Sequence, residues 1–263
     1  MSTPHLPAEI LDHIVDHLHD TEDALRKCCL VSKSWIPRTR LHLFANITFP
    51  AVGSLESWKE TFPDPSMSPA HYAKTLSVGC SEVVMAADAE EGSWIRGFSS
   101  VVHLEVGSQG PFASVSSSLV PFHCISPAIK SLRITFPVLP FQQVFNLILS
   151  FPLLEDLAMT SSYDGSDRPP TARPLRPPML TGSLELYLRG GMEHFIRRLL
   201  SLPGGIHFRK LTLTWPRGED VPLTTRLAEE CFRTLESLGI TCNSLRASIQ
   251  YLRLHRLLTS IPR

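Results

Sequence analysis

Hydrophobic and polar residues in the first 45 positions follow a helical period. Apolar residues are spaced by one, three, one and three positions, as one face of an amphipathic helix requires. These residues are Ile10, Leu11, Ile14, Val15 and Leu18. Pro7 and Glu9 favour a helix start, because a first turn tolerates a missing N–H and attracts a negative charge. Thr21 and Ser32 predict the starts of a second and a third helix, with Pro37 early in the third.

A different pattern begins beyond residue 75, where a leucine, any residue and a second apolar residue recur seven times. The leucines are Leu76, Leu104, Leu132, Leu157, Leu184, Leu211 and Leu238, at intervals of 28, 28, 25, 27, 27 and 27 residues. Several have another apolar residue three positions earlier, namely Ile129, Leu154, Phe208 and Leu235. This alternation predicts about seven short strands, each with one buried side. A period of this length indicates repeats that are stable only when stacked.

The segments between these strands are expected to return the chain from one strand to the next. Three of them read as helices, at residues 141–150, 192–202 and 224–234. Residues 53–61 predict a helix that opens the stack, and residues 245–258 a helix that closes it. Residues 160–180 contain five prolines and cannot form a helix, so a Pro-rich loop is expected there.

The N-terminal helical pattern resembles the F-box. Residues 6–11 read Leu-Pro-Ala-Glu-Ile-Leu, matching the family's L-P-x-E-I-L start, and residues 30–35 read Leu-Val-Ser-Lys-Ser-Trp, matching its L-V-[CS]-K-x-W end. The resemblance implies docking on the Skp-type adaptor of SCF ubiquitin ligases, which links to cullin and RING subunits. It assigns adaptor contact to Leu6, Pro7, Glu9, Ile10, Ile14, Leu18, Leu25, Leu30, Val31, Lys33 and Trp35. Leu11, Val15 and Cys29 are expected inside the module instead.

The later repeats resemble the divergent leucine-rich repeats that often follow an F-box. The implied fold class is α/β: a small all-helical F-box in residues 1–45, then a leucine-rich-repeat-like solenoid with a short parallel sheet in residues 46–263. One feature departs from the family pattern. The asparagine expected three positions beyond each strand is present only as Asn243, so a regular side-chain ladder is not expected.

If the repeats stack, the residue between the two anchors of each strand faces an open side of the sheet. These residues are Ser77, Glu105, Arg133, Ala158, Glu185, Thr212 and Gly239. The predicted contacts to a protein substrate are Glu105, Arg133, Asp156, Glu185, Lys210 and Thr212. Arg133 is the first residue to test, because arginine is enriched among residues that dominate binding energy.

Charge and composition exclude several classes of function. With 25 basic and 25 acidic residues the chain lacks the basic excess expected of a nucleic-acid-binding protein. The two long uncharged stretches, residues 106–129 and 134–154, are interrupted by prolines, serines and amides, so no membrane span is expected. The first ten residues are not a secretory signal, and the six cysteines form no C-x-x-C pair. A cytoplasmic or nuclear protein with reduced thiols is expected.

Candidate chemistry is sparse. His13 and His17 have the four-residue spacing that a helical zinc or nickel site uses, but their exposed positions favour a solvated helix face, so no metal and no cofactor are predicted. No common nucleotide-binding or hydrolase motif is present. The leading hypothesis is a non-catalytic, substrate-recognition subunit of an SCF ubiquitin ligase. The alternatives are an adaptor-bound scaffold or sequestering protein without a ligase role and, more remotely, a metal or thiol enzyme.

Overall fold

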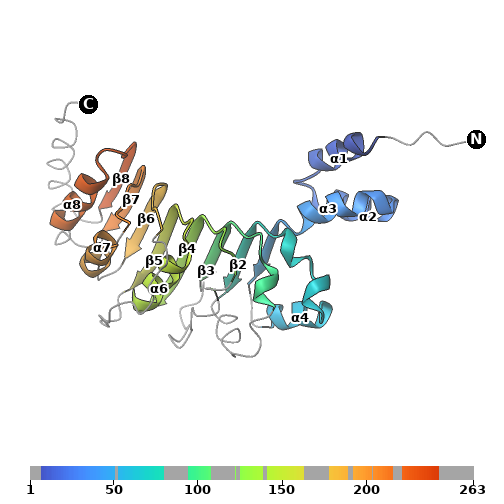
Figure 1. The fold of residues 1–263 in the computed structure, drawn as a ribbon, viewed down its shortest axis with the longest axis horizontal. Helices are drawn as coiled ribbons and strands as arrows, with labels where there is room; N and C mark the ends of the chain where they lie inside the picture. Colours follow the sequence, from blue (N-terminus) through green and yellow to red (C-terminus); the bar gives the residue numbers. More distant parts are fainter. Residues whose placement is uncertain are drawn as a thin grey trace, which may run out of the picture.

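The chain folds into a mixed α/β structure built on one parallel sheet (Figure 1). The computed structural model describes residues 7–50, 53–79, 94–107, 122, 125–138, 141–162, 178–188, 192–202, 204–215 and 221–242. Eight strands lie side by side in the order of the chain. They are β1 Asn46–Phe49, β2 Thr75–Gly79, β3 His103–Gly107, β4 Ser131–Val138, β5 Asp156–Ser162, β6 Ser183–Leu188, β7 Lys210–Trp215 and β8 Ser237–Cys242. The predicted α/β class and parallel sheet are confirmed.

The strand register aligns the leucines that defined the sequence repeat. Leu76 pairs with Leu104, and the pairing continues through every leucine of the series to Leu238. The sheet has one strand more than predicted, because β1 carries Ile47 and Phe49 in place of the leucine-led tripeptide. Ile47 pairs with Leu76, and both side chains are buried. Alternation of buried and exposed positions therefore defines the strands better than leucine itself does.

The chain enters most strands through the same backbone hydrogen bonds. One carbonyl just before a strand accepts two N–H groups, one from the residue before the next strand and one from the first residue of that strand. For example, Ala45 O accepts from the N–H groups of Lys74 at 2.8 Å and Thr75 at 2.9 Å. The carbonyls that accept in this way are those of Ala45, Lys74, Val102, Lys130, Gly182 and Arg209. These bonds fix neighbouring strands in register, since they satisfy polar groups that the strand ladder does not reach.

The return segments contain the predicted helices, and all but α6 have shifted ends. Helix α6 spans Phe141–Ser150 as predicted, and α7 spans Met192–Leu200. Helix α8, Val221–Cys231, begins three residues before the predicted start, because Pro222 favours the first helical turn. The opening helix is α4, Ser54–Thr61. The closing helix at 245–258, Asn243 and most of the loop at 160–180 lie outside the described residues.

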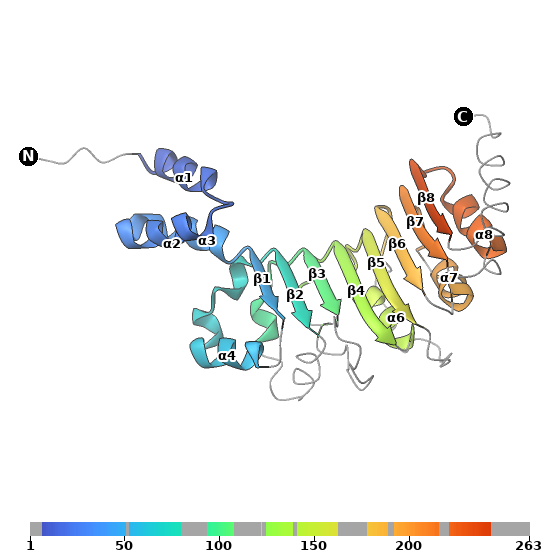
Figure 2. The ribbon, with the colours of Figure 1, turned by 180° about the vertical axis from the view of Figure 1, so that it is seen from behind.

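The helices cover one face of the sheet, and the described part of the chain places no helix on the opposite face (Figures 1 and 2). The covered face is continuous, and both apolar positions of each strand from β1 to β7 are buried in it. Aromatic rings join neighbouring helices, with Phe195 of α7 lying 5.4 Å from Phe141 and 5.1 Å from Phe145 between ring centroids. At the β1 end, Trp58 of α4 packs edge-on to Phe49 at 5.7 Å and closes the core.

The N-terminal residues form a separate group of helices beside β1 (Figures 1 and 2). It contains α1 Ala8–His17, α2 Glu22–Val31, the 3-10 turn η1 Lys33–Trp35 and α3 Ile36–Leu43. Helix α3 leads into β1 with only Phe44 and Ala45 between them. Phe44 packs against the sheet core, 6.4 Å from Trp58, so the helical group is attached directly to the first strand.

Candidate functional site: an exposed apolar patch and an open sheet face

The helical group leaves four large hydrophobic side chains exposed. The fractional exposures are 48% for Ile10, 38% for Ile14, 86% for Leu30 and 66% for Val31. We call these four residues the N-terminal patch. All four are among the positions to which the family resemblance assigns adaptor contact. Exposed aliphatic side chains grouped on one small module are typical of a surface that another protein covers.

The interior of the helical group is thin. Its buried hydrophobic residues are Val15, Leu25 and Cys28, to which Thr39 adds a buried polar residue. The prediction that Val15 is internal is confirmed, whereas Leu11 and Cys29 are only partly buried. So few buried side chains cannot balance the conformational entropy of ordering three helices without help from packing elsewhere.

Leu25 was predicted to contact the adaptor, but its side chain is buried in the helical group. Its side chain is 1% exposed and packs inside the helical group, so it does not lie on the exposed surface. The reason is the orientation of α2: Leu25 and Cys28, three residues apart, share the inward face, while Leu30 and Val31 end the helix on the outside. The sequence periodicity groups Leu25 with other apolar residues. It cannot distinguish a side chain inside the module from one on the surface that a partner covers.

The other predicted contact positions differ in exposure. Pro7, Glu9 and Lys33 are exposed, while Leu18 and Trp35 are partly buried. Leu6 lies outside the described residues. These positions add polar groups and an indole ring to the aliphatic patch, in keeping with interfaces that have an apolar centre and a polar rim.

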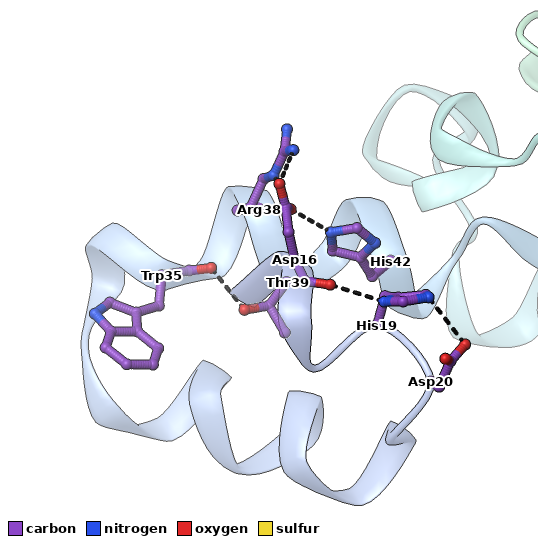
Figure 3. Close-up of polar contacts among 7 residues, drawn as sticks. All are labelled: Asp16, His19, Asp20, Trp35, Arg38, Thr39 and His42. Atoms are coloured by element: carbon purple, nitrogen blue, oxygen red, sulfur yellow. Dashed lines mark hydrogen bonds and ion pairs between the residues drawn. The ribbon is translucent and has the colours of Figure 1, made fainter. Parts of the chain in front are cut away.

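A charged network joins α1 to α3 (Figure 3). Arg38 donates to Asp16 through Nε, 2.6 Å from Oδ1, and through Nη2, 2.5 Å from Oδ2. His42 Nε2 donates to Oδ1 at 2.7 Å. The Arg38 guanidinium and then the His42 imidazole hold the pKa of Asp16 well below its usual range. The carboxylate in turn raises the pKa of Arg38.

The residues around this network are also fixed to backbone. His19 Nδ1 donates to the Asp16 carbonyl at 2.8 Å, and Thr39 donates its hydroxyl proton to the Trp35 carbonyl at 2.7 Å (Figure 3). Sequence analysis did not predict this network, because in the sequence Asp16 is one of several polar residues on the outer face of α1. Its partner Arg38 is 22 positions away on a different helix, so only the packing angle of the two helices brings them together.

The open face of the sheet contains the row of residues that the repeats predicted. Register places Ser77, Glu105, Arg133, Ala158, Glu185, Thr212 and Gly239 side by side on consecutive strands. Arg133 Nη2 lies 3.3 Å from Glu185 Oε2, two strands away. The small side chain of Ala158 on the strand between them leaves room for this ion pair. Lys210 and Thr212 are exposed nearby, and Glu105 is partly exposed.

Asp156 does not present a free carboxylate on this face. Its Oδ1 accepts hydrogen bonds from the backbone N–H of Ser183 at 2.6 Å and from the Ser183 hydroxyl at 2.7 Å. At this one step Glu155 O accepts from Gly182 alone, and the Asp156 side chain takes the place of the second carbonyl contact. Asp156 therefore holds β6 in register, a role that the substrate-contact prediction missed.

A second row on the open face was also missed. On each strand from β4 to β8, this second row lies two residues after the predicted row. Its members pair in register and are Thr135, Thr160, Tyr187, Thr214 and Thr241. Tyr187 supplies the aromatic residue that the predicted row lacked, and 37% of it is exposed. Continuing the two-residue alternation one step further along each strand would have found this row.

Two features of the described residues bear on the metal and thiol alternatives. His13 and His17 lie with their Nε2 atoms 3.2 Å apart on the exposed side of α1, but no cluster of three or more potential metal ligands occurs among the described residues. Burial raises the pKa of the Cys231 thiol to about 11, so this thiol is protonated at neutral pH. In the part of the chain that the structure describes, no helix is both long and apolar enough to span a bilayer.

Comparisons with protein families and with curated proteins found no match. No protein-family profile matches this chain, and no curated protein matches it significantly. Function is therefore inferred from the N-terminal patch, from the Asp16 network between α1 and α3, and from the open face of the sheet.

Proposed function

We propose that this protein is the substrate-recognition subunit of an SCF-type ubiquitin ligase. The N-terminal patch binds a Skp-type adaptor, and the open face of the sheet binds a protein substrate. The observation that carries the proposal is the N-terminal patch itself: Ile10, Ile14, Leu30 and Val31 are exposed at motif positions of a module with a thin interior. In this arrangement the chain is not catalytic. It holds the substrate near a conjugating enzyme that the cullin and RING subunits bring, so its contribution is proximity.

Four exposed aliphatic side chains can supply a substantial part of the binding free energy of an interface. Burying one aliphatic side chain contributes about 1.5–3 kcal/mol, and a few such residues commonly dominate an interface. Leu30 and Val31 gain most from being covered, because they are the most exposed of the four. The charged residues Glu9 and Lys33 are exposed near the patch and can provide orientation through complementary charges on the adaptor.

The sheet supports the second half of the proposal. Its open face presents polar and charged side chains in rows across eight strands. Stacked repeats commonly use such an extended surface to bind other proteins. The face carries Arg133 and Tyr187, which are residue types enriched at binding hot spots.

Copurification with a Skp-type adaptor tests adaptor binding. The variants Leu30→Asp and Ile14→Asp place a charge in the patch, and Trp35→Ala removes the partly buried ring at another predicted contact position. We expect all three to lose most of the bound adaptor. Leu153→Asp is the matched control, because Leu153 is 52% exposed on the sheet domain and lies outside the patch. Undiminished binding by the three patch variants, or none by the parent chain, would refute the proposal.

Ligase activity requires a separate test. The full chain, the adaptor, cullin, RING subunit and conjugating enzyme are combined, and ubiquitin transfer to cellular proteins or to the chain itself is measured. We expect transfer that is lost with Leu30→Asp. Adaptor binding without any transfer would instead identify an adaptor-bound scaffold.

A further inference from the structure

Helix α1 has little hydrophobic attachment to the rest of the helical group. Val15 is its one fully buried side chain, and Ile10 and Ile14 point outward. A single buried aliphatic side chain contributes about 1.5–3 kcal/mol, which is comparable with the cost of ordering one or two residues. Such a contact also leaves the rotation of the helix poorly defined, because apolar packing is not directional. Something else must set the direction in which α1 presents Ile10 and Ile14.

Asp16, next to Val15, provides that directional contact. Arg38 and His42 are four residues apart on α3 and therefore lie on the same face, from which both reach the carboxylate. The two-point contact between guanidinium and carboxylate restricts distance and orientation together. Oδ1 accepts from both partners, so the carboxylate is held on two sides.

Helix α3 is itself fixed relative to the second half of the patch. The Thr39 hydroxyl bonds to the carbonyl of Trp35 and thereby ties α3 to η1. Only Ser32 separates turn η1 from α2, whose last residues are Leu30 and Val31. The orientation of Ile10 and Ile14 relative to Leu30 and Val31 is thus transmitted through Asp16 and α3.

We propose that Asp16 is a positioning residue for adaptor docking. Its contacts with Arg38 and His42 fix the rotation of α1, so that the two halves of the N-terminal patch meet one partner surface together. This inference rests on the proposed function. Asp16 is not itself a member of the patch, and neither the repeat pattern nor the family resemblance assigned it a role.

A double-mutant cycle on the full chain tests the inference. Adaptor affinity is measured by titration calorimetry for the parent, Asp16→Asn, Arg38→Gln and the double variant, and helix content is measured by circular dichroism. We expect each single variant to bind about tenfold more weakly with unchanged helix content, and the double variant to bind no more weakly than either single variant. Glu22→Gln is the matched control, since its ion pair with Arg26 lies within α2 and should leave affinity unchanged.

The outcomes separate this inference from the proposed function. If the parent binds the adaptor and Asp16→Asn binds equally well, Asp16 does not position the patch, although the proposed function stands. Fully additive effects of Asp16→Asn and Arg38→Gln on adaptor affinity would also overturn the inference that Asp16 positions the patch. If Asp16→Asn loses helix content, adaptor affinity is measured for Arg38→Lys instead. Lysine keeps the charge but not the two-point contact. Weaker binding by Arg38→Lys supports positioning, and parental affinity overturns it. A parent chain that does not bind removes both proposals.

Discussion

Arg133 on β4 and Glu185 on β6 form an ion pair across the strand between them, with 3.3 Å between Nη2 and Oε2. Both side chains are about half exposed, at 51% and 54%. A pair this exposed contributes little to stability, because water screens it. Its residues are therefore available for binding without a large cost to the fold.

We expect Arg133→Ala to abolish most substrate capture while changing the free energy of unfolding by less than about 0.5 kcal/mol. Proximity labelling with the full chain measures capture, and urea unfolding measures stability. Lys130→Ala is the matched control, since Lys130 forms a similar exposed pair with Glu155 at the entrance to the strands. An unchanged set of labelled proteins for Arg133→Ala would exclude this residue from substrate recognition.

Leu25 and Leu30 lie on the same helix, yet substitution of the two should have opposite consequences. Leu25→Ala leaves a cavity at a fully buried site and should destabilise the helical group by about 2–5 kcal/mol. Leu30→Ala removes an exposed side chain and should change stability by less than about 0.5 kcal/mol while weakening adaptor binding. Denaturant unfolding and adaptor titration of both variants measure this contrast. Equal losses of stability would mean that Leu30 is packed in the folded chain.

The stability of the pairing between β5 and β6 should depend on Asp156 and Gly182. Asp156→Ala leaves the Ser183 N–H without its acceptor, at a cost of about 1–3 kcal/mol. A Cβ added at Gly182 would overlap Asp156 Oδ1, so Gly182→Ala should also destabilise the chain.

The two substitutions at this pairing should not be additive, because removing the Asp156 side chain also removes the overlap. Urea unfolding of both single variants and of the double variant measures the coupling. Additive losses would show that the overlap is relieved elsewhere.

The Asp16 network should resist mild acid. The pKa of the Asp16 carboxyl group is lower in the folded chain than in the unfolded chain. The contribution of this group to stability is therefore complete above the unfolded pKa of about 4. That contribution is lost progressively as the pH falls from the unfolded value through the lower folded pKa. The difference in free energy of unfolding between the parent and Asp16→Asn should persist at about pH 5 and shrink below about pH 4. Urea titrations across this range test the sign, and a difference that grows in acid would contradict the network.

The strands could be predicted closely because their signal is local. A residue on a strand has its side chain on one face or the other according to its position alone, so the alternation at Leu132 and Ile134 marks a buried face without knowledge of neighbours. The same reasoning missed β1, where Ile47 replaces leucine, because the search followed one residue type instead of burial. It placed α8 three residues late, because the helix start at Pro222 was not recognised.

The sequence by itself determined the periodic elements, their stacking order and the row of residues from Ser77 to Gly239, because near-equal intervals bring equivalent positions together. Only the tertiary structure decided which apolar residues of the N-terminal helices are inside, as Leu25 is, and which are exposed, as Leu30 is. Only the tertiary structure shows that Asp16 bonds to Arg38 and that Asp156 bonds to Ser183. These contacts depend on the angles and distances between separate elements, which periodicity along the chain does not encode.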